Sequence, residues 1–127
     1  MAEILKLGKI NTQPLEKEFR EILTDEIVIT NERLEHIKLR HPQDYKLFVE
    51  YGATTVEAPD IIIKDEKNKG TVFMVRHLDN TNLNVVVRLV LSEDNENLKN
   101  SVMTFYRLRQ KNLMKLERKN KVLYKKE

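Results

Sequence analysis

After Asp60 the chain carries short runs rich in β-branched and other apolar residues, a pattern typical of strands. Turn-forming residues at 68–70 and 79–82 separate these runs. We therefore expect strands over 60–64, 71–78, 83–91 and 101–108. Because strands that follow one another through short turns pair as neighbours, they predict an antiparallel meander. The polar segment 92–100 is expected to be a longer loop.

The N-terminal quarter contains apolar residues at both strand-like and helix-like spacing. Residues 3–10 alternate loosely and predict an edge strand, and the β-branched run 26–29 predicts a second, short strand. Between them, Pro14 suits the first position of a helix, and Leu15 and Phe19 recur at helical spacing. This spacing predicts a helix from Pro14 to about residue 25.

Two consecutive helices are predicted after the second strand. Thr30 is a suitable N-cap for the first of them. Pro42 disfavours helix at His41, so the first helix should end or bend there and the second should begin at Pro42. Gly52 suits the C′ position of the second helix. With a last helix over about 110–118, the order of helices, sheet and closing helix predicts an α+β fold.

Composition predicts one globular domain over residues 1–127. Apolar residues make up 40% of the chain and charged residues 34%, and no apolar run approaches the ~20 residues of a membrane span. The first residues lack the basic and apolar regions of a secretory signal. There is no cysteine, which excludes disulfides and thiolate metal sites. We therefore expect a cytoplasmic protein.

The charge is distributed unevenly. The chain carries a net charge of +3, but residues 109–127 alone hold eight basic and two acidic side chains. Such a segment attracts phosphate backbones without reading their sequence. The same pattern also fits a solvated helix face followed by a tail.

Candidate acid–base residues lie in the predicted helix before Pro42. Histidine exchanges a proton near neutral pH, and arginine holds phosphate. His36 and Arg40 share a helix face, whereas His41 is five residues from His36 and falls on another face at the helix end. The alternative interpretation is a capping or surface histidine without a chemical role.

Polar residues on the predicted strands supply further candidates. Arg88 lies among valines, where it could clamp a phosphate or simply point to solvent with its stem packed down. Thr104 and Tyr106 share a strand face, where a hydroxyl could bond a phosphate and a ring could stack on a base. Strand propensity alone also accounts for threonine and tyrosine here.

Several kinds of chemistry lack their motifs. The chain has no His-Glu-x-x-His, no calcium loop, no glycine-rich phosphate loop and no Gly-x-Ser-x-Gly elbow. We therefore expect no metal, no cofactor and no serine hydrolase or nucleotide triphosphate chemistry.

An ordered set of segments resembles a known nuclease superfamily. The set comprises Thr30, His36-Ile37 and Arg40-His41-Pro42, then residues 58–62, 100–106 and 122–125. Together they resemble the phage and mobile-element nucleases of the barnase–EndoU–colicin E5/D–RelE-like group over roughly residues 26–125, with 1–25 as an extension. The resemblance implies N-terminal helices packed on a four-stranded antiparallel sheet.

The resemblance also implies metal-independent endoribonuclease activity, in which the ribose 2′-hydroxyl attacks its own phosphate. By position, His36 and His41 match the acid–base histidines of the group and Thr104 its last-strand hydroxyl. Arg76 and Arg88 are candidates for stabilising the phosphate by their strand positions. The expected RNA-binding residues are Arg40, Tyr106, Arg107, Arg109 and Lys111.

Two kinds of partner follow from this resemblance. The first is RNA, and the second is an acidic inhibitor protein of the antitoxin or immunity type, which a toxin-like nuclease with a basic face would need. The alternative is a non-catalytic RNA- or protein-binding module that uses the same basic sheet and C-terminal segment.

Overall fold

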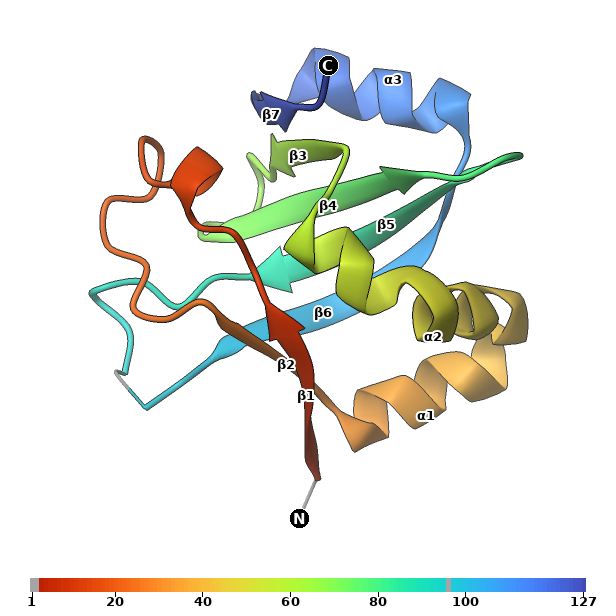
Figure 1. Ribbon diagram of the computed structural model, residues 1–127, viewed down its shortest axis with the longest axis horizontal. Coiled ribbons are helices and arrows are strands. Elements are labelled where there is room, and N and C mark those ends of the chain that lie inside the picture. Colours follow the sequence, from red (N-terminus) through yellow and green to blue (C-terminus); the bar gives the residue numbers. More distant parts are fainter. Residues whose placement is uncertain (1–2, 96) are drawn as a thin grey trace.

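A seven-stranded sheet runs through the molecule, with helices on both of its faces (Figure 1). The computed structural model describes residues 3–95 and 97–127. The elements are, in chain order, β1 (Ile4–Lys9), the short 3-10 helix η1 (Gln13–Leu15), β2 (Glu26–Thr30), α1 (Asn31–Arg40), α2 (Pro42–Glu57), β3 (Ile61–Lys64), β4 (Thr71–His77), β5 (Asn82–Arg88), β6 (Asn100–Leu108), α3 (Gln110–Lys119) and β7 (Val122–Lys125).

The sheet order is β1-β2-β6-β5-β4-β3-β7, so the antiparallel meander of β3 to β6 forms its centre. Every pairing is antiparallel except that of β2 with β6, where Ile27 lies beside Asn100 and Val28 beside Ser101. The α+β class is confirmed. The expectation of four strands was an undercount, because β1 and β2 extend one edge of the meander and β7 extends the other.

The alternating strand residues build a separate apolar layer on each face. Leu83, Val85 and Val87 of β5 are buried beneath α2, where the ring of Phe48 stacks on that of Phe105 at 3.9 Å between centroids. The opposite face carries a smaller cluster in which Ile61, Ile63, Val75 and Leu108 enclose Leu113 of α3. Figure 1 shows α2 crossing the strands and α3 beside β7.

The helix predicted from Pro14 to about residue 25 was wrong, since only Gln13–Leu15 form a short 3-10 helix there. Leu15 and Phe19 are buried as their spacing suggested. The following backbone, however, bonds to a distant segment instead of to itself: Leu23 donates to the Val90 carbonyl at 3.0 Å, and Ile22 forms a bridge with Leu91.

Gly52 does not end α2, which continues to Glu57 and stops before Pro59. Gly52 lies inside the helix, where a Cβ atom would approach Cδ1 of the Phe48 ring to 2.7 Å. Its role is therefore close packing against that ring. The predicted break at His41 and the last helix agree with α1, α2 and α3.

The predicted loop 92–100 contains no helix or strand over 92–95 and 97–99, and Glu96 of that loop lies outside the described residues. The preceding strand was expected to reach residue 91, but β5 ends at Arg88.

Candidate functional site

A basic stripe runs along one face of α1. The helix begins at Thr30, whose Oγ1 accepts a hydrogen bond from the Arg33 N–H at 3.2 Å. Arg33, His36 and Arg40 then follow at i, i+3 and i+7, the spacing that places residues on one helix face. All three side chains are exposed, and a hollow of about 410 Å³ lies among Thr30, Glu32, Arg33 and His36.

Arg33 connects this stripe to the sheet. Its guanidinium donates a hydrogen bond to the carbonyl of Met103 in β6. Met103 lies at an irregularity of the β5–β6 ladder, where Val86 faces Thr104 but the next residue, Val87, faces Val102. The Met103 side chain is therefore displaced from the regular alternation and lines a second groove, so the α1 stripe and the sheet face adjoin at this residue.

The second groove has a volume of about 520 Å³ and is predominantly basic. Its lining residues are Asp65, Lys67, Asn68, Lys69, Thr71, Val86, Arg88 and Met103. The carboxylate of Asp65 accepts hydrogen bonds from the Lys67 N–H at 3.0 Å and from the Asn68 amide at 2.8 Å. The loop therefore anchors this carboxylate within the groove.

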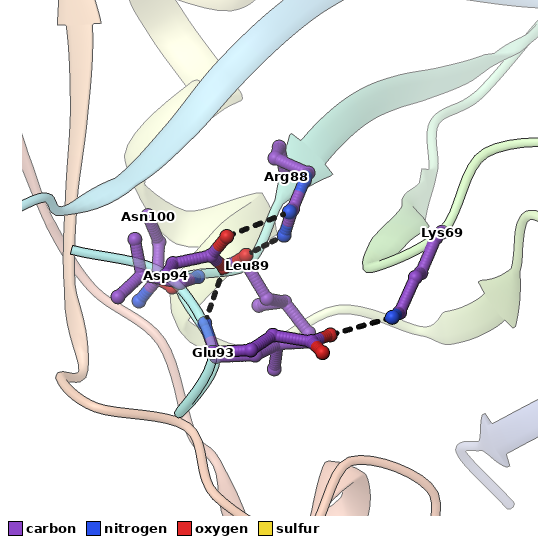
Figure 2. A network of polar contacts seen from close by, with 8 residues as sticks. Lys69, Arg88, Leu89, Glu93, Asp94 and Asn100 are labelled. Carbon is purple, nitrogen blue, oxygen red and sulfur yellow. Dashed lines mark hydrogen bonds and ion pairs between the residues drawn. The ribbon is translucent and has the colours of Figure 1, made fainter.

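Arg88 is held by a polar network at the end of β5 (Figure 2). Its guanidinium donates to the Leu89 carbonyl and forms an ion pair with Asp94 at 3.3 Å. The Leu91 N–H donates to Asp94 at 2.8 Å, and this bond, with the charge of Arg88, lowers the pKa of the Asp94 carboxyl. Nearby, Lys69 pairs with Glu93 at 2.6 Å. The network fixes the guanidinium in place and leaves it partly exposed.

Gly70 makes room for this arginine. A Cβ atom at Gly70 would approach Nη1 of Arg88 to 2.3 Å. The backbone also has a φ of 74°, which favours glycine. Gly70 lies in the turn between β3 and β4. Glycine at this position therefore gives the turn its backbone conformation and leaves space for the Arg88 side chain.

The structure brings three of the predicted residues onto one sheet face. In the β5–β6 ladder, Arg88 faces Ser101 and Val86 faces Thr104. Asn84 and Tyr106 form the next pair on the same face, which is the one opposite α2. Thr104 and Tyr106 are half-buried, and Tyr106 packs against the α3 cluster.

Arg76 and Arg107 lie on the other face, against α2. Arg76 donates to Thr54 at 3.4 Å and lies 5.5 Å from the centroid of the Tyr51 ring. Nε of Arg107 donates to Asp44 at 2.7 Å. The structure therefore separates these two arginines from Arg88 and Thr104.

The remaining predicted residues occupy helix ends. His41 is exposed at the break between α1 and α2, where its N–H donates to the Ile37 carbonyl at 2.7 Å, so it lies off the face that carries His36. Arg109 is the N-cap residue of α3, and Lys111 lies in the first turn; both are exposed.

Two residues of this region were not identified as candidates from the sequence. Arg33 could have been found, because its spacing to His36 and Arg40 is visible in the sequence. Asn84 could not, because its significance depends on its surroundings: it is fully buried, and neither atom of its amide has a hydrogen-bond partner among residues 3–95 and 97–127.

Over residues 3–95 and 97–127, no three histidine, aspartate or glutamate side chains gather closely enough to hold a metal ion. In the same ranges, no helix has the length and apolar character needed to span a bilayer.

A family model described as phage-Barnase-EndoU-ColicinE5/D-RelE like nuclease2 matches residues 2–125. No curated protein and no solved structure matches the chain.

Proposed function

The chain belongs to this family of phage nucleases, and from that premise we propose that it is a metal-independent endoribonuclease. The observation that carries the proposal is the junction at Met103. There a helix stripe with a proton carrier, His36, adjoins a sheet face that carries a fixed cation, Arg88, and a hydroxyl, Thr104. Cleavage of RNA by its own 2′-hydroxyl is accelerated by proton transfer and by a cation at the phosphate, and a hydroxyl can donate a further hydrogen bond to the phosphate.

In the proposed reaction, a base takes the proton of the ribose 2′-hydroxyl while the 2′ oxygen bonds to phosphorus. The P–O5′ bond breaks, an acid protonates the 5′ oxygen, and the products are a 2′,3′-cyclic phosphate and a 5′-hydroxyl. DNA lacks the 2′-hydroxyl and would not be cut. We assign the proton transfers to His36 and His41, and phosphate stabilisation to Arg88, Arg76 and Thr104.

The geometry favours His36 and Arg88 within that assignment. His36 lies on the stripe that reaches the sheet through Arg33, whereas His41 lies off it. Arg88 shares the face of Thr104, whereas Arg76 contacts α2. Tyr106 would stack on a base, and Arg40, Arg107, Arg109 and Lys111 would attract the backbone.

Three further proposals follow from this function. We assign the catalytic core to residues 26–125, with 1–25 extending the sheet through the pairing of β1 with β2. The protein would act on RNA in the cytoplasm. Its inhibitor would be an acidic protein that covers the Arg33–His36–Arg40 stripe, because charge complementarity guides such pairs.

The test is incubation of the purified protein with total RNA, tRNA and a DNA of matched sequence in excess EDTA. We expect RNA fragments with 2′,3′-cyclic phosphate ends and intact DNA. His36→Ala should lower the cleavage rate by about 10²- to 10⁴-fold, the usual range for general acid–base catalysis. His41→Ala is measured in parallel, and Glu35→Ala, at an exposed site of the same helix, is the control.

Cleavage of both RNA and DNA would refute attack by the 2′-hydroxyl. Absence of any cleavage, together with RNA retention that weakens steeply with salt, would replace the enzyme with the binding module.

A further inference from the structure

The third histidine, His77, lies at the end of β4 on the sheet face that carries Thr104 and Tyr106. Its backbone N–H donates to the Asp60 carboxylate at 2.7 Å, and Nδ1 of its ring lies 2.6 Å from Oδ1 of Asn82. One hydrogen bond therefore holds the backbone of His77 and another orients its ring, although the residue as a whole is exposed.

Only one orientation of the Asn82 side-chain amide satisfies its hydrogen-bond partners. The side chain is almost completely buried, and its amide nitrogen donates to the Leu108 carbonyl at 2.8 Å and to Gln110 at 3.4 Å. Because only the nitrogen of an amide can donate, Oδ1 must face the histidine. Nδ1 of His77 therefore carries a proton that it donates to Asn82, and Nε2 is the end left for another partner.

The free end of His77 belongs to a hollow of about 380 Å³. The hollow is lined by His77, Leu78, Asp79, Asn80, Thr81, Asn82 and Gln110. Among the described residues, Nε2 has no hydrogen-bond partner. Protonated at Nε2, the ring would present a charged N–H donor to a ligand in this hollow, with its other N–H already satisfied.

The charged groups around the hollow come from three segments. Asp60 precedes β3 and is engaged by the His77 N–H, and Asp79 belongs to the turn after β4. Arg109 and Lys111 flank Gln110 at the start of α3, whose first turn has no side-chain cap. The uncapped N–H groups of that turn add to the attraction for an anion.

The hollow continues the face already described. His77 faces Asn82, which in turn faces Leu108 across the ladder. Measured from Leu108, Tyr106 is two residues back along β6, or about 7 Å, and Thr104 is four residues back, or about 13 Å, while His77 lies about 10 Å away across two strands. Because Leu113 of α3 packs against Val75 and Leu108 on this face, an RNA strand that reaches both Tyr106 and His77 would pass around α3.

We propose that His77, oriented by Asn82, is a phosphate-binding subsite for single-stranded RNA. This inference rests on the proposed function for the identity of the ligand. Its contact is a hydrogen bond from Nε2–H of the charged ring to a phosphate oxygen.

The test measures binding of a 2′-O-methyl oligonucleotide, which cannot be cleaved by the proposed route, at pH 6. His77→Gln should weaken binding about tenfold, as expected for a hydrogen bond to a charged group. Asp79→Asn is the matched control, because removing an anion from the same hollow should tighten binding.

Equal binding by the wild type and His77→Gln at pH 6 would overturn the subsite. If His77→Gln does not fold, unchanged binding by Asp79→Asn overturns the proposal on its own. Failure of the wild type to cleave natural RNA would refute the proposed nuclease and leave this binding result standing.

Discussion

Two buried asparagines show how differently one residue type behaves in this sheet. Asn100 is fully satisfied: its carbonyl accepts from the Val90 N–H at 2.8 Å, and its amide donates to the Thr24 and Glu26 carbonyls. Asn84 is equally buried, yet its amide has no hydrogen-bond partner in the part of the chain that the structure describes. Burying an unpaired amide opposes folding, so the two side chains have opposite effects on stability.

Asn84→Leu keeps the number of side-chain heavy atoms and removes the unpaired amide. We expect the free energy of unfolding to rise by about 1–3 kcal/mol. Urea titration measures it, with Asn100→Leu as the control that should lower it by a similar amount or more. A loss of stability in Asn84→Leu would show that the amide has partners in solution.

The turn glycine at 70 offers a test of Arg88 that leaves the arginine in place. Gly70→Ala introduces a methyl group where Nη1 of Arg88 lies, in a backbone conformation that alanine disfavours. We expect a loss of about 1 kcal/mol or more in stability and a fall in RNA cleavage, because the guanidinium must move. Cleavage assays on folded protein check this, with Arg88→Lys for comparison.

If Gly70→Ala folds and cleaves RNA at the wild-type rate, the position of the Arg88 guanidinium is irrelevant to the reaction.

At the scale of elements, α2 depends on a glycine in its interior. Alanine normally stabilises a helix interior by up to about 1 kcal/mol relative to glycine. In α2 we expect Gly52→Ala to destabilise instead, because its Cβ would displace the Phe48 ring from its stack on Phe105. A lower melting temperature would support this, and Ala53→Gly, at the exposed neighbouring position, measures the propensity effect alone.

The helices around Pro42 and the meander were predictable because their signals are local. Thr30 and Pro42 mark helix boundaries by short-range sterics and hydrogen bonding, and alternation marks strands. The irregular segment after η1 was not predictable, since its backbone bonds to residues 90 and 91. The parallel pairing of β2 with β6 likewise depends on residues far apart in the chain.

The candidate site was only partly predictable for the same reason. Alternation shows which residues of one strand share a face, but the faces of two strands are matched by their register. Because Arg76 faces Leu83 across the ladder, it shares the α2 face and not that of Arg88. The orientation of His77 depends on Asn82 and on the Leu108 carbonyl of another strand.

At the scale of the whole molecule, Glu18 connects three distant parts of the chain. Its carboxylate pairs with Lys64 of β3 at 2.9 Å and with Lys121, just before β7, at 3.2 Å. Hydrogen bonds from Lys64 and then Lys121 lower the pKa of Glu18 below its ordinary value of 4.5. These two ion pairs connect the segment after η1 to the β3–β7 edge of the sheet.

The lowered pKa of Glu18 sets the direction of a pH effect. Its stabilising contribution is present above the pKa of the unfolded chain and is lost as pH falls through the lower folded pKa. We expect Glu18→Gln to reduce stability near pH 7 and to approach the wild type at acidic pH. Urea unfolding from pH 7 to pH 3 measures both; a constant difference would mean that Glu18 acts without its charge.

The parallel pairing of β2 with β6 can form only late in the synthesis of the chain. Arg33 and its partner Met103 are 70 residues apart, and β2 meets β6 just before each of them. At ribosomal rates of about 5–20 residues per second, the β1–β2 pair waits roughly 4–14 seconds for its neighbour. During that interval the edge of β2 that carries Ile27 and Val28 has no β6 to pair with, so the N-terminal strand pair is completed only when residues 100 and 101 have been made.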